Sequence, residues 1–90
     1  MEILHDIQKQ KFYVVVDGLE SHLEYVKMEN VLNLIHTYVP NALRGNGIAG
    51  KIVKTALTYA EENNLKIIPS CSYVAAYIQR HKEYENLVAE

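Results

Sequence analysis

Residues 48–60 carry the most regular pattern in the chain, and they constrain its fold most. Apolar residues recur there at helical spacing and form one wide stripe, while polar and charged residues occupy the opposite side. The stripe consists of Ile48, Ala49, Ile52, Val53, Ala56, Leu57 and Ala60. We predict a helix here, with Asn46 as its N-cap and Asn63 or Asn64 as its left-handed end. A helix with one apolar face must pack against a second layer of structure.

Runs of β-branched and aromatic residues on both sides of this helix predict the second layer. Strands are predicted at residues 12–16, 21–27, 31–39 and 65–68. The first and second are separated by the turn sequence Asp17-Gly18, and the second and third by Glu29-Asn30. Beyond the last strand, a shorter helix is predicted from Tyr73 to Gln79, with Ser70 or Ser72 as its cap.

The third of these strands is apolar on both faces. Simple alternation places residues 32, 34, 36 and 38 on one face and residues 31, 33, 35, 37 and 39 on the other. A strand that is apolar on both sides is typical of the interior of a sheet, so we expect it to be central. The predicted order is β-β-β-α-β-α, an α+β (mixed α/β) fold with a largely antiparallel sheet and two helices.

Length and charge narrow the range of functions. We expect residues 1–90 to form a single domain, since 90 residues make no more than one. The net charge of −2 is too small to favour nucleic acid or an acidic membrane surface as a partner. Cys71 is the single cysteine, and we find neither a signal peptide nor an apolar run of membrane-spanning length. We therefore expect a soluble cytoplasmic protein.

The glycine-rich stretch LRGNGIAGKI, residues 43–52, matches parts of two phosphate-binding motifs. Its glycines spell G-x-G-x-x-G, but that dinucleotide motif also needs an acid at the end of the next strand, where this chain reads Pro-Ser-Cys-Ser. The stretch also contains G-x-x-x-x-G-K, but the residue after the lysine is Ile52, which has no hydroxyl for Mg²⁺. Neither motif is complete.

The charges around this loop still favour a bound anion. A helix N-terminus carries about half a positive charge and prefers acidic neighbours. Here Arg44 and Lys51 flank the helix start, while Glu61 and Glu62 lie at its end. Each such exposed misplacement costs about 0.3–1 kcal/mol, and a phosphate at the helix start would reverse the effect there. An ordinary glycine-rich turn with solvated lysines is the alternative that the loop alone leaves open.

A family resemblance distinguishes these alternatives. The hexapeptide Arg44-Gly45-Asn46-Gly47-Ile48-Ala49 resembles the R/Q-x-x-G-x-G/A signature of the GCN5-related N-acetyltransferase superfamily. The segments HTYVPNALRGNGIAGKIV and LKIIPSCSYVAAYI are similar to the small YjdJ-type minimal acetyltransferases, which lack the N-terminal helices of the full fold. The resemblance covers about residues 12–80 and implies a minimal GCN5-like acetyltransferase fold.

The resemblance also implies a ligand, acetyl-coenzyme A (acetyl-CoA), and a set of residues that bind it. Backbone N–H groups of Gly45, Asn46, Gly47, Ile48, Ala49 and Gly50 would hold the pyrophosphate, with Arg44 and Lys51 supplying positive charge. The backbone of Thr37, Tyr38 and Val39 would pair with the pantetheine arm, and one freed N–H would polarise the thioester carbonyl. The acceptor would be an amine, either a small molecule or a protein lysine or N-terminus.

Two side chains are candidates for the chemistry of acetyl transfer. His36 is a candidate general base, because histidine is the side chain most often used to take up a proton near neutral pH, although a hydrogen-bonded histidine on the sheet is the structural alternative. Cys71, between a strand end and a helix start, is either a nucleophile or a residue that lines the thioester pocket. Larger relatives use a tyrosine as the acid where this chain has Gln79, so Tyr73 and Tyr77 are alternatives that also suit packing against the sheet.

Three readings of the sequence therefore stay open, in order of preference. The first is an acetyl-CoA-dependent N-acetyltransferase, the second is a non-catalytic coenzyme A-binding module, and the third is an interaction domain in which the loop is only a turn. We predict no metal site, because His5, His22 and His81 show no ligand spacing with Cys71.

Overall fold

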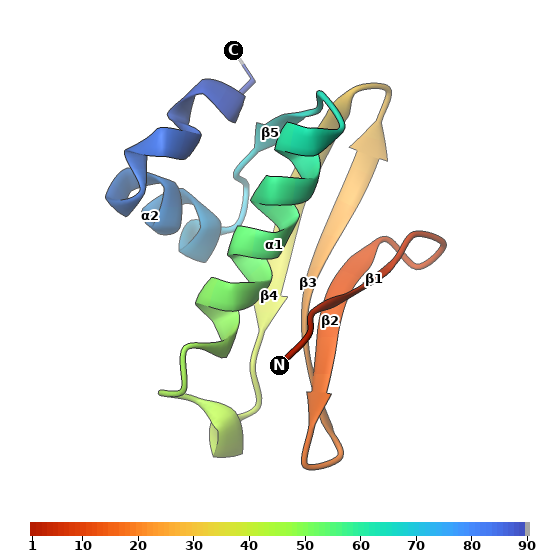
Figure 1. Cartoon of the computed structure of the whole chain (residues 1–90), viewed down its shortest axis with the longest axis vertical. Helices are drawn as coiled ribbons and strands as arrows, with labels where there is room; N and C mark the ends of the chain where they lie inside the picture. Colours follow the sequence, from red (N-terminus) through yellow and green to blue (C-terminus); the bar gives the residue numbers. More distant parts are fainter. Residues whose placement is uncertain (90) are drawn as a thin grey trace.

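The structure is a computed structural model that describes residues 1–89. These residues form a five-stranded sheet in the order β1-β2-β3-β4-β5, in which β1 to β4 are antiparallel and β5 runs parallel to β4. The strands are β1 (Leu4–Asp6), β2 (Lys11–Val16), β3 (Leu19–Met28), β4 (Val31–Tyr38) and β5 (Lys66–Ile68). The prediction of a largely antiparallel sheet in an α+β fold is confirmed (Figure 1).

The predicted turns set the register of the central hairpins. Asp17 and Gly18 both have positive φ, 54° and 77°, and they join β2 to β3 as a two-residue turn. Such turns match the twist of the strands that they connect. Strand β1 was not predicted, because its three residues, Leu-His-Asp, are too few to show a period. It forms on the edge of β2, where the His5 ring stacks on Phe12 with ring centroids 4.0 Å apart.

Both predicted helices are present, and both pack on one side of the sheet. Helix α1 (Ile48–Glu62) lies across the sheet, and α2 (Ser72–Arg80) follows on the β5 side (Figure 1). Two short 3₁₀ helices complete the described chain, η1 (Asn41–Leu43) before α1 and η2 (Lys82–Leu87) after α2. Among residues 1–89 no helix is long and apolar enough to cross a membrane.

The helix ends differ from the prediction in two of three cases. The N-cap of α1 is Gly47, with φ 75°, because the Asn46 side chain instead donates from Nδ2 to the carbonyl of Leu43 at 3.0 Å. The N-cap of α2 is Cys71, and the Ser70 hydroxyl donates to Oδ1 of Asn33 at 2.6 Å. The predicted left-handed end of α1 is confirmed at Asn64, whose φ is 57°.

The apolar stripe of α1 packs onto β2, β3 and β4 to form the core. Ile52, Val53, Ala56, Leu57 and Ala60 are fully buried, as are Leu23, Leu32 and Leu34 of the sheet. The opposite face of the sheet is open to solvent, with Val15 and Val26 exposed on it. Sites on the open face are therefore separated from the helices by the sheet.

A β-bulge in β4 overturns the predicted faces of that strand. Tyr25 pairs with Leu34 and Glu24 pairs with His36, so Ile35 has no partner on β3. The extra residue reverses the alternation from that point, since directly paired residues share a face. Leu32 and Leu34 face the helices, as does Thr37, which pairs with buried Leu23. His36 lies on the open face with Tyr38, and not with Leu32 and Leu34 as simple alternation predicts.

Candidate functional site

The glycine-rich loop connects the end of β4 to the start of α1. Gly45 and Gly47 have φ of 87° and 75°, a left-handed conformation that side chains with a Cβ rarely adopt. A Cβ built on either residue would meet no described atom within 4 Å. The space around these two glycines is therefore open, and a ligand can approach the backbone there without obstruction.

The start of α1 presents backbone N–H groups towards that space. The first helical N–H with a partner one turn back is that of Lys51, which donates to the carbonyl of Gly47 at 3.2 Å. The N–H groups before it have no such partner, as at every helix N-terminus. The first turn reads Ile-Ala-Gly-Lys, without an acid, and the Lys51 side chain is exposed. The partial positive charge of the helix start and the cationic side chain of Lys51 therefore lie in the same turn.

Arg44 and Asn46 hold the shape of the loop. Nε of Arg44 donates to the carbonyl of Val39 at 3.0 Å and ties the loop back to the end of β4. The Asn46 amide makes the corresponding contact with Leu43. Because Nε is engaged, the terminal nitrogens of the exposed Arg44 guanidinium are the ones left for an anion. Arg44, assigned to the anion site as a cation, and Asn46, assigned to it through its backbone N–H, thus also stabilise the shape of the loop.

Strands β4 and β5 separate beside this loop. Pairing between them covers only Val31, Leu32 and Asn33 of β4. One residue further, the N–H of Cys71 donates to the carbonyl of Leu34 at 2.9 Å, after which the chain enters α2. Among residues 1–89, no strand therefore lies beside the backbone from Ile35 to Val39 on this edge. Thr37, Tyr38 and Val39 lie there, where the sequence places the pantetheine contact.

Cys71 lies at the point where the strands separate. Its sulfur is 3.3 Å from the hydroxyl oxygen of Thr37, whose side chain the bulge turns to the helix side. Burial opposes ionisation of the thiol, but hydrogen bonds from the Thr37 hydroxyl and from the backbone N–H groups of Val74 and Tyr73 outweigh it. The pKa of Cys71 is therefore lowered. The sequence named Thr37 only for its backbone, because no local pattern brings positions 37 and 71 together.

The lowered pKa of the Cys71 thiol leads to a prediction about its alkylation. The thiolate is the reactive form, so the alkylation rate should rise with pH and level off above the thiol pKa. We expect the midpoint with iodoacetamide below the ordinary value of about 8.5. In Thr37→Val the midpoint should move upward, because the hydroxyl that stabilises the thiolate is gone. The urea-unfolded chain is the internal reference, and an identical midpoint in folded and unfolded chains would contradict the assignment.

The two tyrosines named as acid candidates lie close to the loop. A Cβ on Gly50 would stand 3.6 Å from the Tyr73 hydroxyl and 3.8 Å from Cε2 of Tyr77. Tyr77 is buried and its ring stacks on His81 at 4.1 Å between centroids. Burial, followed by the neighbouring Tyr84, raises the pKa of Tyr77. Tyr73 is half-buried, so of the two it is the more accessible to a ligand at the helix start.

His36 does not share this environment. It pairs with Glu24 on the open face, whereas Thr37 and Cys71 lie on the helix side of β4. The structure therefore does not bring the imidazole of His36 and the thiol of Cys71 together on one face. Instead, His36 lies next to His22, with ring centroids 6.2 Å apart.

Comparisons with known proteins identify the family and the fold of this chain. Residues 11–87 match the family described as GCN5-related N-acetyl-transferase. Protein NATD1 of Mus musculus is 34% identical over 85 residues, which are 90% of this chain and 76% of the mouse protein, and Protein NATD1 of Gallus gallus is 33% identical over the same shares. A GCN5-like protein from Staphylococcus aureus, solved by NMR, superposes with a TM-score of 0.75 at 33% identity, covering 98% of this chain and 87% of that one. The chain belongs to the GCN5-related N-acetyltransferase family.

Proposed function

We propose that this protein binds acetyl-CoA through residues 44–51 and transfers the acetyl group to an amine, as a member of the small YjdJ-type branch. The observation that carries the proposal is the start of α1. Two left-handed glycines, Gly45 and Gly47, leave the backbone open there, no acid lies in the first turn, and Arg44 and Lys51 stand beside it. Membership of the family supports acetyl-CoA over other phosphorylated ligands.

The proposed path of the ligand follows the edge of β4. The pyrophosphate lies on the N–H groups of the loop, and the pantetheine amides pair with the uncovered backbone of residues 37–39, as a strand adds to a sheet edge. The bulge at Ile35 frees backbone groups next to this path, and an N–H there is suited to polarise the thioester carbonyl. The thioester then lies near Cys71, where β4 and β5 separate.

Two routes for the acetyl group are compatible with this placement. In direct transfer, the neutral amine attacks the thioester carbonyl, the carbon–sulfur bond breaks, and the proton lost by the amine passes to the departing coenzyme A thiolate. In the relay route, the Cys71 thiolate attacks first and coenzyme A leaves as a thiolate. The amine then attacks the acetyl-cysteine, its carbon–sulfur bond breaks, the Cys71 thiolate is regenerated, and the amine proton passes to the coenzyme A thiolate. His36 serves as the base only for an acceptor that approaches from the open face, since it lies opposite Cys71.

A non-catalytic coenzyme A-binding module is the second candidate. It is favoured by Gln79, which stands where larger relatives have a tyrosine and is exposed on α2. Such a module would keep the loop and the cytoplasmic location expected for the enzyme, and it would lack only turnover. Binding and transfer must therefore be measured separately.

The first experiment is a calorimetric titration with acetyl-CoA, with ATP and NAD⁺ as controls. We expect saturable binding of acetyl-CoA alone. Release of coenzyme A is then followed with a panel of polyamines, free lysine and peptides with free N-termini. Turnover with an amine supports the enzyme, and binding without turnover on any amine of the panel favours the module. A folded chain that does not bind acetyl-CoA would overturn both.

The role of Cys71 is tested in the same assay. Cys71→Ala should change the affinity for acetyl-CoA by no more than a few-fold, because the loop supplies most of the contacts. If the relay route operates, transfer should slow strongly, and acetyl-cysteine should be found by mass spectrometry in the wild-type chain without an acceptor. Unchanged transfer in Cys71→Ala would leave direct attack as the route.

A further inference from the structure

Three side chains of types that can bind a metal meet on the open face of the sheet, away from the glycine-rich loop. His22 and Glu24 are two residues apart on β3 and therefore point to the same side. His36 is the direct partner of Glu24 on β4. One ligand atom from each of the three residues lies within 4.8 Å of the other two. The bulge is what brings His36 to this face.

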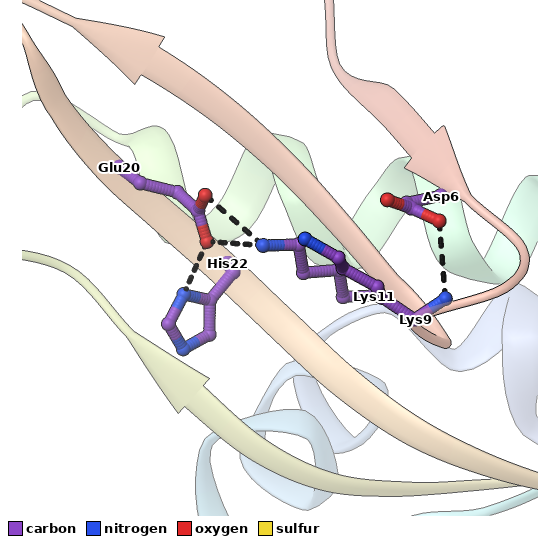
Figure 2. A network of polar contacts seen from close by, with 5 residues as sticks. All are labelled: Asp6, Lys9, Lys11, Glu20 and His22. Atoms are coloured by element: carbon purple, nitrogen blue, oxygen red, sulfur yellow. Dashed lines mark hydrogen bonds and ion pairs between the residues drawn. The ribbon is translucent and has the colours of Figure 1, made fainter.

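A fourth residue orients the first histidine. Nδ1 of His22 is 2.9 Å from Oε2 of Glu20, and Lys11 binds both oxygens of the same carboxylate at 3.0 and 2.9 Å (Figure 2). With the Nδ1 proton donated to Glu20, the lone pair of His22 is on Nε2. A carboxylate that holds the second nitrogen of a histidine is the usual support of a metal ligand. The two contacts from Lys11 hold the Glu20 carboxylate in place beside His22.

We propose that His22, Glu24 and His36 bind one divalent transition-metal ion, with Zn²⁺ as the best match, and that Glu20 positions His22. Two imidazoles and one carboxylate are a ligand set that suits zinc and leaves a fourth position open to solvent. Ligand atoms about 2.0–2.2 Å from zinc lie roughly 3.4 Å from one another in a tetrahedron. These side chains are exposed or half-buried, so they are free to rotate towards that spacing.

The residues around His22, Glu24 and His36 favour a metal site rather than three side chains that are simply solvated. The Glu24 carboxylate makes no ion pair with a lysine or arginine among the described residues, although Lys11 lies directly opposite it on β2. Tyr38 borders His22, with ring centroids 5.7 Å apart, and limits the space on one side. The inference does not rest on acetyl-CoA binding, since neither the glycine-rich loop nor Cys71 is part of this cluster.

The test is a titration with ZnCl₂ alone, in the full chain carrying Cys71→Ser so that the thiol cannot bind the ion. We expect one ion per chain by calorimetry. His22→Ala, His36→Ala and Glu24→Gln should each weaken binding at least tenfold, and Glu20→Ala should weaken it by about 10–100-fold through His22. His81→Gln, which removes a histidine outside the cluster, is the matched control and should bind as the parent does.

Co²⁺ provides an independent readout, because a tetrahedral site gives it an intense visible absorption band that hexaaqua cobalt lacks. We expect that band in the parent and in His81→Gln, and its loss in His36→Ala. Circular dichroism of each variant confirms that the chain is folded. Zinc binding that is absent in the folded parent, or equally strong in His22→Ala, His36→Ala and Glu24→Gln, would overturn the proposal.

Discussion

Gly47→Val is expected to abolish binding of acetyl-CoA while the chain still folds. Gly47 is the N-cap of α1, with φ 75°, and open space surrounds the position of a Cβ. A valine side chain would occupy that space and keep the pyrophosphate from the N–H groups behind it. We expect calorimetry to show a loss of affinity of about a hundredfold or more, equivalent to roughly 2.8 kcal/mol.

The control for this variant is Gly18→Val. Gly18 has nearly the same φ, 77°, and a Cβ there likewise meets no described atom within 4 Å. Both variants therefore carry the same backbone strain, about 1–2 kcal/mol, and both should melt about 4–16 °C below the parent. Only Gly47→Val should lose the ligand, because Gly18 lies in the β2–β3 turn. Equal affinities in the two variants would exclude the loop as the binding site.

Leu34→Ala is expected to destabilise the protein by about 2–5 kcal/mol. Leu34 is fully buried, pairs with Tyr25, and is the last residue of β4 before the bulge. Truncation would leave a cavity beneath α1 that the surrounding core fills only in part. The measurement is urea unfolding followed by circular dichroism, in which the midpoint should fall while the slope stays near that of the parent.

The neighbouring residue provides the matched control. Ile35 is 43% exposed and has no partner on β3, so Ile35→Ala should cost less than about 1 kcal/mol. A large loss for Ile35→Ala with a small one for Leu34→Ala would mean that the bulge lies elsewhere in β4 and that its faces are assigned wrongly. His36 and Thr37 would then also exchange sides.

Local sequence patterns were sufficient to predict most of the helices and strands. The stripe from Ile48 to Ala60 identified α1, and the turn residues Asp17 and Gly18 marked the β2–β3 hairpin, because each pattern depends only on neighbours in the chain. The pattern was insufficient for β1, which is held by pairing with β2 and by the stacking of His5 on Phe12. The caps of α1 and α2 also differed, because Asn46 and Ser70 found other hydrogen-bond partners.

The candidate site was likewise predicted from the sequence only in part. The spacing of Gly45, Gly47 and Lys51 at the start of an amphipathic helix predicted an anion-binding loop as one of two alternatives, since such a loop is built from consecutive residues. The family resemblance then favoured it over an ordinary turn. The sequence also singled out Cys71, but not the Thr37 hydroxyl beside its sulfur. These two residues are 34 positions apart, and a contact of that kind depends on how β4 and α2 pack.

The sequence by itself determined the α+β class and the glycine-rich helix start, because both follow from patterns within short segments, and its resemblance to a known signature indicated the family. Only the tertiary structure decided which side chains share a face. One unpaired residue at Ile35 turns Thr37 towards Cys71 and His36 towards His22 and Glu24. The physical reason is that a bulge is set by the register between two strands, and a single strand carries no information about its partner's register.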